Sequence, residues 1–322
     1  MIRINTELNK SRELMRDVYC STLMELAEKN DQIVVLDADL VSSSGMKPFF
    51  KAFPERAIQC GIAEANMIGI AAGLSVTGKV PFAHSFATFA SRRVCDQIYV
   101  SAAYAKLNVR IIGSDPGVTA AYNGGTHMPF EDMAVLRGIP EITLIEPADT
   151  VALEDIVRQL VDVYGIYYVR MARKNVTSIY CEGSTFEIGK GNMLRNGTDV
   201  TIIASGIMLA EALRAAAILE AEGVSARVVD MFTWKPVDEA LIERCAEETG
   251  AIVTAENHNT YGGLGSAVSE AVVKTLPVPV EMVGTMDRFG QVGTEDFLRR
   301  EYHLTPEAIA EAAKRAIERK HT

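Results

Sequence analysis

The chain has 322 residues, 48% hydrophobic and 23% charged, which is ordinary for a globular protein and long enough for two domains. The formal net charge of −10 argues against nucleic acid or an anionic membrane surface as the main partner. The polar residues 1–17 predict no signal peptide, and no uncharged run is long enough to predict a membrane-spanning helix. Five scattered cysteines without a CxxC pair predict neither a zinc site nor disulfides, and favour a reducing cytoplasm.

Helical and strand patterns alternate along the first half of the chain. They predict a helix from residue 15 to about 29, a buried strand at 32–36, a polar loop at 37–45 and a helix that carries Glu64. The elements predicted next are a strand at 80–83, a helix at 88–105, a strand at 109–112, a loop at 113–130, a strand at 142–145, a helix through 153–160 and a strand at 167–169. Because few hairpin signals appear, we predict a doubly wound, mostly parallel sheet.

The second half of the chain predicts another α/β unit. The pattern lapses at 174–196 into polar sequence with glycines, and the domain boundary is predicted there, giving domains 1–180 and 181–322. The elements predicted in the second domain are strands at 200–204, 226–229 and 252–255, and helices at 208–222, 238–248, 266–274 and 306–320. Open parallel sheets bind ligands at the carboxyl ends of their strands, which makes loop 37–45 a candidate ligand-binding loop.

Glu64 is the only charged residue between Gly61 and Gly78, and small residues surround it. A carboxylate is costly to bury unless another group meets it, and burial prepares it to share a proton with a bound group. The alternative is a solvated glutamate at a helix start, where its charge suits the helix dipole.

The segment from Cys60 to Met67 resembles the signature glutamate segment of the transketolase family of thiamin-diphosphate enzymes. The resemblance continues through the segments 81–89, 96–98, 124–129, 131–137 and 171–175. It extends from about Arg12 to the carboxyl terminus and covers only the second half of a full-length transketolase. The resemblance therefore implies two doubly wound domains, a pyrimidine-binding domain at 1–180 and a transketolase C-terminal domain at 181–322.

The resemblance also implies roles for five residues around the cofactor. Glu64 would contact a ring nitrogen of the aminopyrimidine, while Phe86 and Phe89 would enclose that ring, an aromatic face being suited to orienting a flat heterocycle. Asp39, in Ala-Asp-Leu, matches an acidic residue beside the thiamin. His127, in Gly-Gly-Thr-His-Met-Pro, matches a histidine that lies over the reacting carbon and moves protons on substrate hydroxyls.

Arg173, Arg12 and Ser43 match positions that bind the anionic end of the sugar, a task that suits the planar fork of arginine. Each of them could instead be a surface residue. Two positions depart from the family pattern: Asp115 stands in place of a second histidine near that end, and Asn123 in place of an aspartate that reads an acceptor hydroxyl. An aspartate repels a phosphate, so we expect either a sugar unlike the common pentose phosphates or a shifted loop.

The family holds its metal through a Gly-Asp-Gly element followed by an asparagine, and this chain has no such pattern. We therefore expect no metal ligands here. A separate N-terminal subunit would bind the diphosphate and Mg²⁺ or Ca²⁺, with thiamin diphosphate between the two chains and two copies of each. The expected activity is transfer of a two-carbon ketol unit from a ketose phosphate to an aldose phosphate, and only with that partner.

Three other functions remain open from the sequence. They are the beta subunit of the decarboxylating component of a 2-oxo-acid dehydrogenase, a fragment resembling 1-deoxyxylulose-phosphate synthase, and a catalytically silent scaffold subunit. The glycine-rich stretch 262–265 precedes a helix, but a glycine-rich turn is weak support for a phosphate loop. We interpret it as structural.

Overall fold

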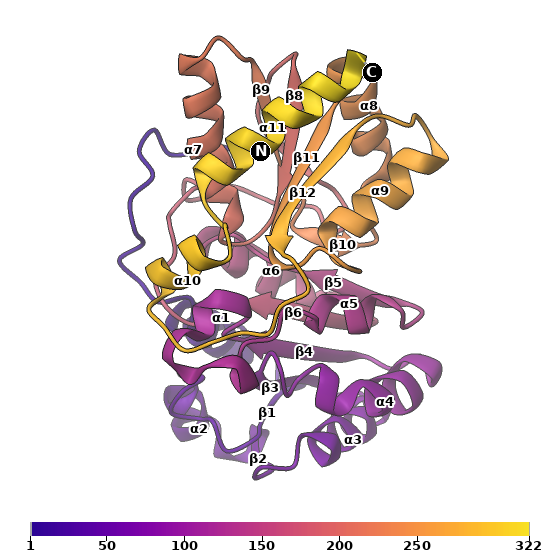
Figure 1. Cartoon of the computed structure of the whole chain (residues 1–322). Coiled ribbons are helices and arrows are strands. Elements are labelled where there is room, and N and C mark those ends of the chain that lie inside the picture. The colour runs from indigo at the N-terminus through magenta and orange to yellow at the C-terminus, as the bar shows by residue number, and fades with distance from the viewer. Residues whose placement is uncertain (1, 322) are drawn as a thin grey trace.

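The computed structural model describes residues 2–321 and contains two β-sheets (Figure 1). The first sheet has the strand order β10-β5-β6-β4-β3-β1-β2, and its strands are parallel except for β10, which runs antiparallel to β5. Its strands are β1 (Ile33–Asp37), β2 (Ala57–Gln59), β3 (Val80–Phe86), β4 (Val109–Ser114), β5 (Ile142–Ile145), β6 (Ile166–Met171) and β10 (Thr233–Lys235).

Helices cover both faces of this sheet. Side chains alternate across a strand, so Phe82 packs in one core cluster with α1 and α6, whereas its neighbour Ala83 packs in the other with α3. The helices of this half are α1 (Met15–Lys29), α2 (Lys47–Ala52), α3 (Glu64–Val76), α4 (Cys95–Gln97), α5 (Asp132–Arg137) and α6 (Thr150–Asp162). The doubly wound arrangement is thus confirmed.

The second sheet has the order β12-β11-β8-β9-β7, with only β7 antiparallel to its neighbour. Its strands are β7 (Asn192–Arg195), β8 (Val200–Ala204), β9 (Ala226–Asp230), β11 (Ile252–Asn259) and β12 (Val280–Thr285). The helices of this half are α7 (Met208–Ala221), α8 (Glu239–Thr249), α9 (Leu264–Lys274), α10 (Glu295–Glu301) and α11 (Pro306–Glu318). Helices α7 and α11 pack together, as do α8 and α9 (Figure 1).

The strongly patterned elements lie within a few residues of their predicted bounds, but one predicted helix is broken. Residues 88–105 contain a 3₁₀ turn at Arg92–Val94, the short α4 and a π-helix at Ile98–Tyr104. The elements that the patterns did not predict are short or at the sheet edges: α2, β2, α5, β7, β10, β12 and α10. Strand β3 also runs past its predicted end to Phe86, which brings that ring to the edge of the sheet.

Buried polar contacts join the two halves. Arg170, which is fully buried, contacts Asp132 at 2.9 Å, pairs with Glu146 and donates to the backbone oxygen of Asn257 at 2.8 Å. Glu146 also accepts a 2.6 Å hydrogen bond from Ser205 of the second half. Both ion pairs lie within the first half, whereas the bonds to Asn257 and from Ser205 cross to the second half. A hydrogen bond to a charged group contributes about 1.5–3 kcal/mol, so these two bonds help to hold the halves against each other.

The proposed domain boundary at 180/181 lies between the last strand of the first half and β7, although β10 returns to the first sheet. Residues 2–14, the amino-terminal arm, run along the segment that follows β6. The N–H of Asn5 donates to the carbonyl of Ile179, and the N–H of Ser11 donates to the carbonyl of Val176. Among residues 2–321, no helix has the length and apolar character needed to cross a membrane.

Candidate functional site

Most of the predicted site residues gather where the strands of the first sheet end. Strands β1, β3, β4 and β6 are parallel neighbours, with Phe86 paired in register to Ser114 and Ser114 to Met171. Because their carboxyl ends meet at one edge, the segments that follow them lie close together. This edge carries the polar loop after β1, Phe86, Asp115 and Arg173.

Glu64 is the first residue of α3, and its side chain is only 3% exposed. One carboxylate oxygen lies 2.7 Å from Nη1 of Arg93, and the other lies 3.4 Å from the hydroxyl of Ser85. The positive end of the helix dipole also favours a carboxylate at this position. The carboxylate is therefore buried but compensated, and its nearest partner, Arg93, is a residue that the sequence reasoning missed.

Phe86, Phe89 and His127 form an aromatic cluster beside this carboxylate. The His127 ring stands edge-on to Phe89 at 5.1 Å and to Phe86 at 6.0 Å. The guanidinium of Arg93 lies 4.0 Å from the centroid of the Phe89 ring and so links the cluster to Glu64. Nδ1 of His127 lies 2.9 Å from the hydroxyl oxygen of Thr126, which orients the imidazole.

The loop that carries His127 is held by the second half of the chain. Asn257, at the end of β11, accepts a hydrogen bond from the N–H of Val118 at 2.9 Å and donates to the backbone oxygen of Pro116 at 3.0 Å. Gly117 has a positive φ of 52°, and a Cβ there would lie 2.2 Å from the Asn257 side chain. A glycine is therefore required at this close approach.

Three of the predicted substrate-binding residues also meet at this edge. Nη2 of Arg173 lies 2.9 Å from Asp115, and its guanidinium lies 5.5 Å from the centroid of the Phe86 ring. Arg16 donates from its backbone to the carbonyl of Arg173 at 3.3 Å and from Nη1 to the carbonyl of Ser43 at 3.1 Å. Arg16, a second residue that the sequence reasoning missed, thus joins Arg173 to Ser43, and Arg173 in turn pairs with Asp115.

Burial shifts the pKa values of several groups in this region, and two of these groups, His84 and Asp115, interact with Arg173. Burial, with a smaller contribution from Arg173, lowers the pKa of His84 to about 3, so this fully buried imidazole is neutral. Burial raises the pKa of Asp115, while the charges of Arg173 and Lys174 act in the opposite direction.

Three other predicted residues are exposed and make none of the contacts described above. Arg12 is exposed in a surface groove of the amino-terminal arm, which Glu154 and Glu182 also line. Asp39 is exposed with a positive φ of 63°, and its N–H donates to Gln59 at 2.7 Å. Asn123 is exposed at the end of a 3₁₀ helix, Gly117–Asn123.

Sequence signals for the two missed arginines were present but ambiguous. Arg16 directly follows Met15, the first residue of the apolar helical pattern, so it lies in the first turn of that helix. Arg93 follows Phe89 by one helical turn, the spacing at which side chains share a face. The sequence does not distinguish Arg93 from its neighbour Arg92 as a partner of Glu64. In the structure, Arg92 pairs with Glu131 at 2.5 Å.

Comparison with known proteins identifies the family. The family model described as "Transketolase, pyrimidine binding domain" matches residues 14–178, and "Transketolase, C-terminal domain" matches 189–309. The chain belongs to the transketolase family. It is 49% identical, over 98% of each chain, to the "6-deoxy-6-sulfo-D-fructose transketolase subunit SqwH" of Clostridium sp. (strain MSTE9). It is 39% identical to one subunit of the "Apulose-4-phosphate transketolase" of Phocaeicola vulgatus, over 92% of this chain and 96% of that one.

A solved structure described as "Split gene transketolase, inactive beta4 tetramer" superposes with a TM-score of 0.89. It shares 44% sequence identity, and the match covers 95% of this chain and 99% of that chain. This transketolase-family chain therefore matches nearly the full length of a subunit from a split-gene transketolase.

Transketolases use thiamin diphosphate, and the site fits the pyrimidine end of that cofactor. The fit rests on Arg93, whose planar guanidinium donates to Glu64 and lies against the Phe89 ring. The site thus accepts a flat group that carries N–H donors, as an aminopyrimidine does. Among residues 2–321, no cluster of three or more histidine, cysteine, aspartate or glutamate side chains could hold a metal ion.

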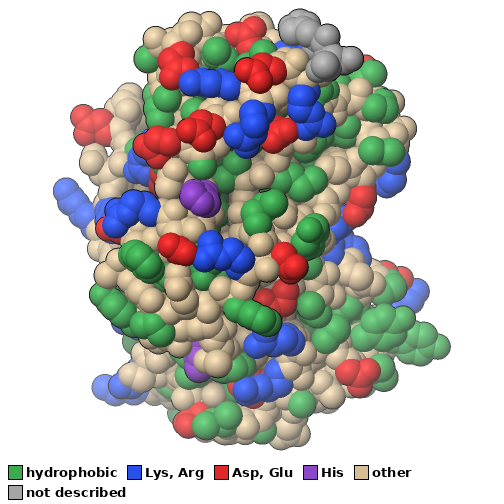
Figure 2. All heavy atoms as spheres, in the orientation of Figure 1, with side chains coloured by type: hydrophobic (Ala, Val, Ile, Leu, Met, Phe, Trp, Pro, Cys, Tyr) green, Lys and Arg blue, Asp and Glu red, His purple; other side chains and the backbone are tan. Residues whose placement is uncertain are grey.

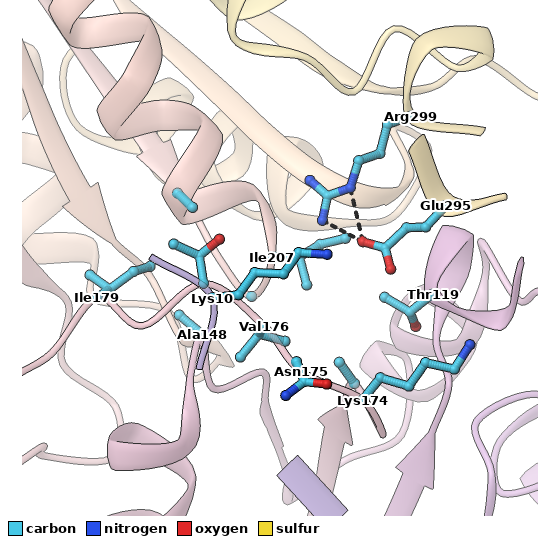
Figure 3. A pocket seen from close by; sticks show the side chains of 14 residues that line it. Lys10, Thr119, Ala148, Lys174, Asn175, Val176, Ile179, Ile207, Glu295 and Arg299 are labelled. Atoms are coloured by element: carbon cyan, nitrogen blue, oxygen red, sulfur yellow. Dashed lines mark hydrogen bonds and ion pairs between the residues drawn. The ribbon is translucent and has the colours of Figure 1, made fainter. Parts of the chain in front are cut away.

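A separate pocket lies between the two halves of this transketolase subunit (Figure 3). Lys10, Lys174 and Arg299 line it together with Glu295, and Glu295 already pairs with Arg299 at 2.7 Å. None of the catalytic candidates lines this pocket, so it belongs to the junction of the halves.

Proposed function

We propose that this chain is the C-terminal subunit of a split transketolase that transfers a two-carbon ketol unit from a ketose to an aldose. The observation that carries the proposal is the meeting of Glu64, Phe89 and His127 at one edge of the sheet. A catalytically silent scaffold would have no need of a compensated buried carboxylate beside an aromatic–histidine cluster. Membership in the family and the likeness to split-enzyme subunits support the same function.

In this proposal the cofactor, when bound, supplies the cleavage and formation of the carbon–carbon bond. Glu64 would hold a proton shared with a pyrimidine nitrogen, and Phe86 and Phe89 would orient that ring. His127 would exchange protons with substrate hydroxyls, a contribution typically worth ~10²–10⁴-fold in rate. Asp39 would lie beside the thiamin.

We also propose that the anionic end of the sugar binds where Arg173 and Ser43 meet. Arg16 joins this set more directly than Arg12, because Arg16 contacts both segments whereas Arg12 lies in the groove of the amino-terminal arm. Two relatives carry the names of a sulfonated ketose and a ketose phosphate, which supports a substrate with an anionic end. Asn123 would lie near the acceptor.

A partner subunit would complete the enzyme. We propose an N-terminal transketolase subunit that binds the diphosphate and Mg²⁺ or Ca²⁺, with two copies of each chain. The likeness to a split-gene transketolase supports this division. Five unpaired cysteines among residues 2–321 support a reducing cytoplasm as its location.

The test is a two-carbon transfer assay of this subunit alone and mixed with its partner, supplied with thiamin diphosphate, Mg²⁺, a ketose and an aldose. We expect turnover only in the mixture. Replacing wild type with Glu64→Gln should abolish that turnover while the complex still assembles on gel filtration. Decarboxylation of a 2-oxo acid by the mixture would instead favour a dehydrogenase subunit, and unchanged turnover with Glu64→Gln would refute the catalytic assignment.

A further inference from the structure

His84 is a fully buried histidine that the proposed mechanism does not use. It lies in β3 between Phe82 and Phe86, two residues from each, so all three side chains point to the face of the sheet that α1 covers. Neither ring nitrogen of His84 has a hydrogen-bond partner among residues 2–321. Buried polar atoms are normally satisfied, so two unpartnered nitrogens on one buried ring indicate that another group bonds to them.

The His84 ring lies between Tyr19 of α1 and Arg173 at the sheet edge. The Tyr19 ring stands edge-on to it with the centroids 5.6 Å apart. Burial and, to a smaller extent, the charge of Arg173 lower the pKa of His84 to about 3, so the imidazole is neutral beside the guanidinium. Arg16, three residues before Tyr19 on α1, contacts the backbone of Arg173. One face of α1 therefore passes from the Arg173 segment to the His84 ring.

The charged groups on the segments that pack around this ring already have partners. They are the ion pairs Arg173–Asp115 at 2.9 Å and Arg16–Asp17 at 3.5 Å, and Asp37, which accepts a hydrogen bond from Ser44 at 2.9 Å and is paired in register with His84. Lys174 is exposed and lines the separate pocket between the halves (Figure 3). A neutral imidazole adds no charge to this set.

The buried atoms that lack hydrogen-bond partners here include both donors and acceptors. Nε of Arg173 can only donate, and the oxygens of ionised Asp115 can only accept. The His84 imidazole and the Tyr19 hydroxyl can each do both. A bound anion would satisfy only the donors. Water donates and accepts, and a buried water makes about three hydrogen bonds to such groups, so this cluster fits ordered water.

We propose that His84 is a positioning residue, which holds the guanidinium of Arg173 through ordered water in the orientation that meets the anionic end of the sugar. The inference rests on the proposed binding of that end by Arg173. His84 lies two residues back along β3 from Phe86, whose ring centroid is 5.5 Å from the guanidinium, so it acts through Arg173 and not on the substrate. A neutral side chain suits this place because a cation would repel the guanidinium.

The experiment uses the complex of this subunit with its N-terminal partner, loaded with thiamin diphosphate and Mg²⁺. Steady-state kinetics are measured with a donor that has an anionic end, fructose 6-phosphate or 6-deoxy-6-sulfofructose, and with the uncharged ketose erythrulose. We expect His84→Leu to raise the KM for the anionic donor about tenfold, as when a hydrogen bond to a charged group is weakened. Its kcat, and both constants for erythrulose, should stay at the wild-type values. His84→Gln keeps a donor and an acceptor and should restore most of the lost affinity.

His258→Leu is the matched control. His258 is also fully buried, but its Nδ1 lies 2.7 Å from the carbonyl oxygen of Asn259 in the second half. Its replacement should leave the ratio of kcat/KM between the two donors unchanged. A His84→Leu variant that loses both donors equally would overturn the inference, because His84 would then only support the fold. Wild-type kinetics in His84→Leu would overturn it as well.

A crystal structure of the wild-type complex separates this inference from the proposed function. If the wild-type complex turns over neither kind of donor, ketol transfer from these sugars fails, and the structure still tests His84. We expect an ordered water within hydrogen-bonding distance of a His84 ring nitrogen and of Arg173 or Asp115. A His84 ring without such a water would refute the inference. This measurement also decides the matter if His84→Leu does not fold.

Discussion

Arg93 makes both of the contacts that we propose for the aminopyrimidine. Its guanidinium lies 2.7 Å from Glu64 and 4.0 Å from the Phe89 ring centroid, while its side chain remains 44% exposed. A bound pyrimidine ring and this guanidinium cannot occupy the same face of Phe89. The side chain is exposed enough to swing away, so cofactor binding would exchange one planar nitrogen-bearing group for another.

We therefore expect Arg93→Ala to bind thiamin diphosphate more tightly in the complex of the two subunits. A partly exposed ion pair and a cation–π contact together contribute about 1–2 kcal/mol, which corresponds to a gain in affinity of roughly 5- to 30-fold. Isothermal titration calorimetry with the cofactor measures this directly. Arg92→Ala, which removes the neighbouring arginine that pairs with Glu131, should leave the affinity unchanged. Weaker cofactor binding by Arg93→Ala would mean that Arg93 supports the bound ring instead of yielding to it.

At the scale of elements, the loop that carries His127 depends on a strand from the other half of the chain. The loop 116–127 contains an unusual backbone conformation at Ala121, with φ of 47° and ψ of −116°, and the side chain of Asn257 satisfies two of its backbone groups. Gly125 packs so closely on the second half that a Cβ would lie 2.3 Å from the backbone oxygen of Gly290. The C-terminal half thus holds the loop that carries His127 in place, through the Asn257 hydrogen bonds and the close packing of Gly125 on Gly290. We call these contacts the clamp.

Asn257→Ala should release that clamp. The loss of two buried hydrogen bonds should lower the free energy of unfolding by about 1–3 kcal/mol and make the loop amides exchange faster with solvent. Hydrogen–deuterium exchange would locate the change, and the two-carbon transfer assay should show a lower kcat with cofactor affinity retained. The control is Thr201→Val in β8, which removes the buried hydrogen bond between the hydroxyls of Thr201 and Thr249. This variant should be less stable, but the amides of residues 116–127 should exchange no faster than in wild type. Equal exchange in both variants would contradict the clamp.

Considered as a whole molecule, the chain leaves an apolar surface beside the candidate cofactor site. Ile62, Val76, Val100 and Tyr104 are each more than half exposed, and α3 contacts the π-helix Ile98–Tyr104. Hydrophobic side chains gather at the lower right of the face shown in Figure 2, over the part of the first half that contains α4. Exposed apolar patches of this kind commonly mark association surfaces, which suits the partner subunit that we propose.

A charge placed on this surface should block assembly. We expect Tyr104→Glu to weaken binding to the N-terminal partner at least tenfold, because a carboxylate buried at an interface without a counter-charge is costly. Analytical ultracentrifugation of the mixture would measure the change, and the isolated variant should melt at the wild-type temperature. Tyr261→Glu alters a tyrosine of similar exposure in the second half and should assemble normally. Normal assembly of Tyr104→Glu would exclude this residue from the interface.

Much of the architecture was accessible from the sequence because periodicity is a local property. The apolar spacing in α1, β8 and α7 places these elements within a few residues of their observed bounds, and the alternation of strands with helices indicates the parallel sheets. Glu64 stands out in the sequence as the only charged residue between Gly61 and Gly78, although composition alone left a solvated helix start open. The short edge strands were not predicted because they have no clear apolar alternation of their own. They form strands because they pair with a neighbouring strand.

Tertiary structure alone decided which charged groups meet at the site. Sequence placed Arg12 and Arg16 four residues apart without indicating which of them reaches Ser43. The resemblance put Asp115 and Arg173 near the same end of the sugar without indicating that they pair with each other. The parallel register of β4 and β6 brings the last two together, and the start of α1 at Met15 orients Arg16. Local patterns report how a segment folds, whereas the charge and selectivity of a site depend on which strand ends become neighbours in space.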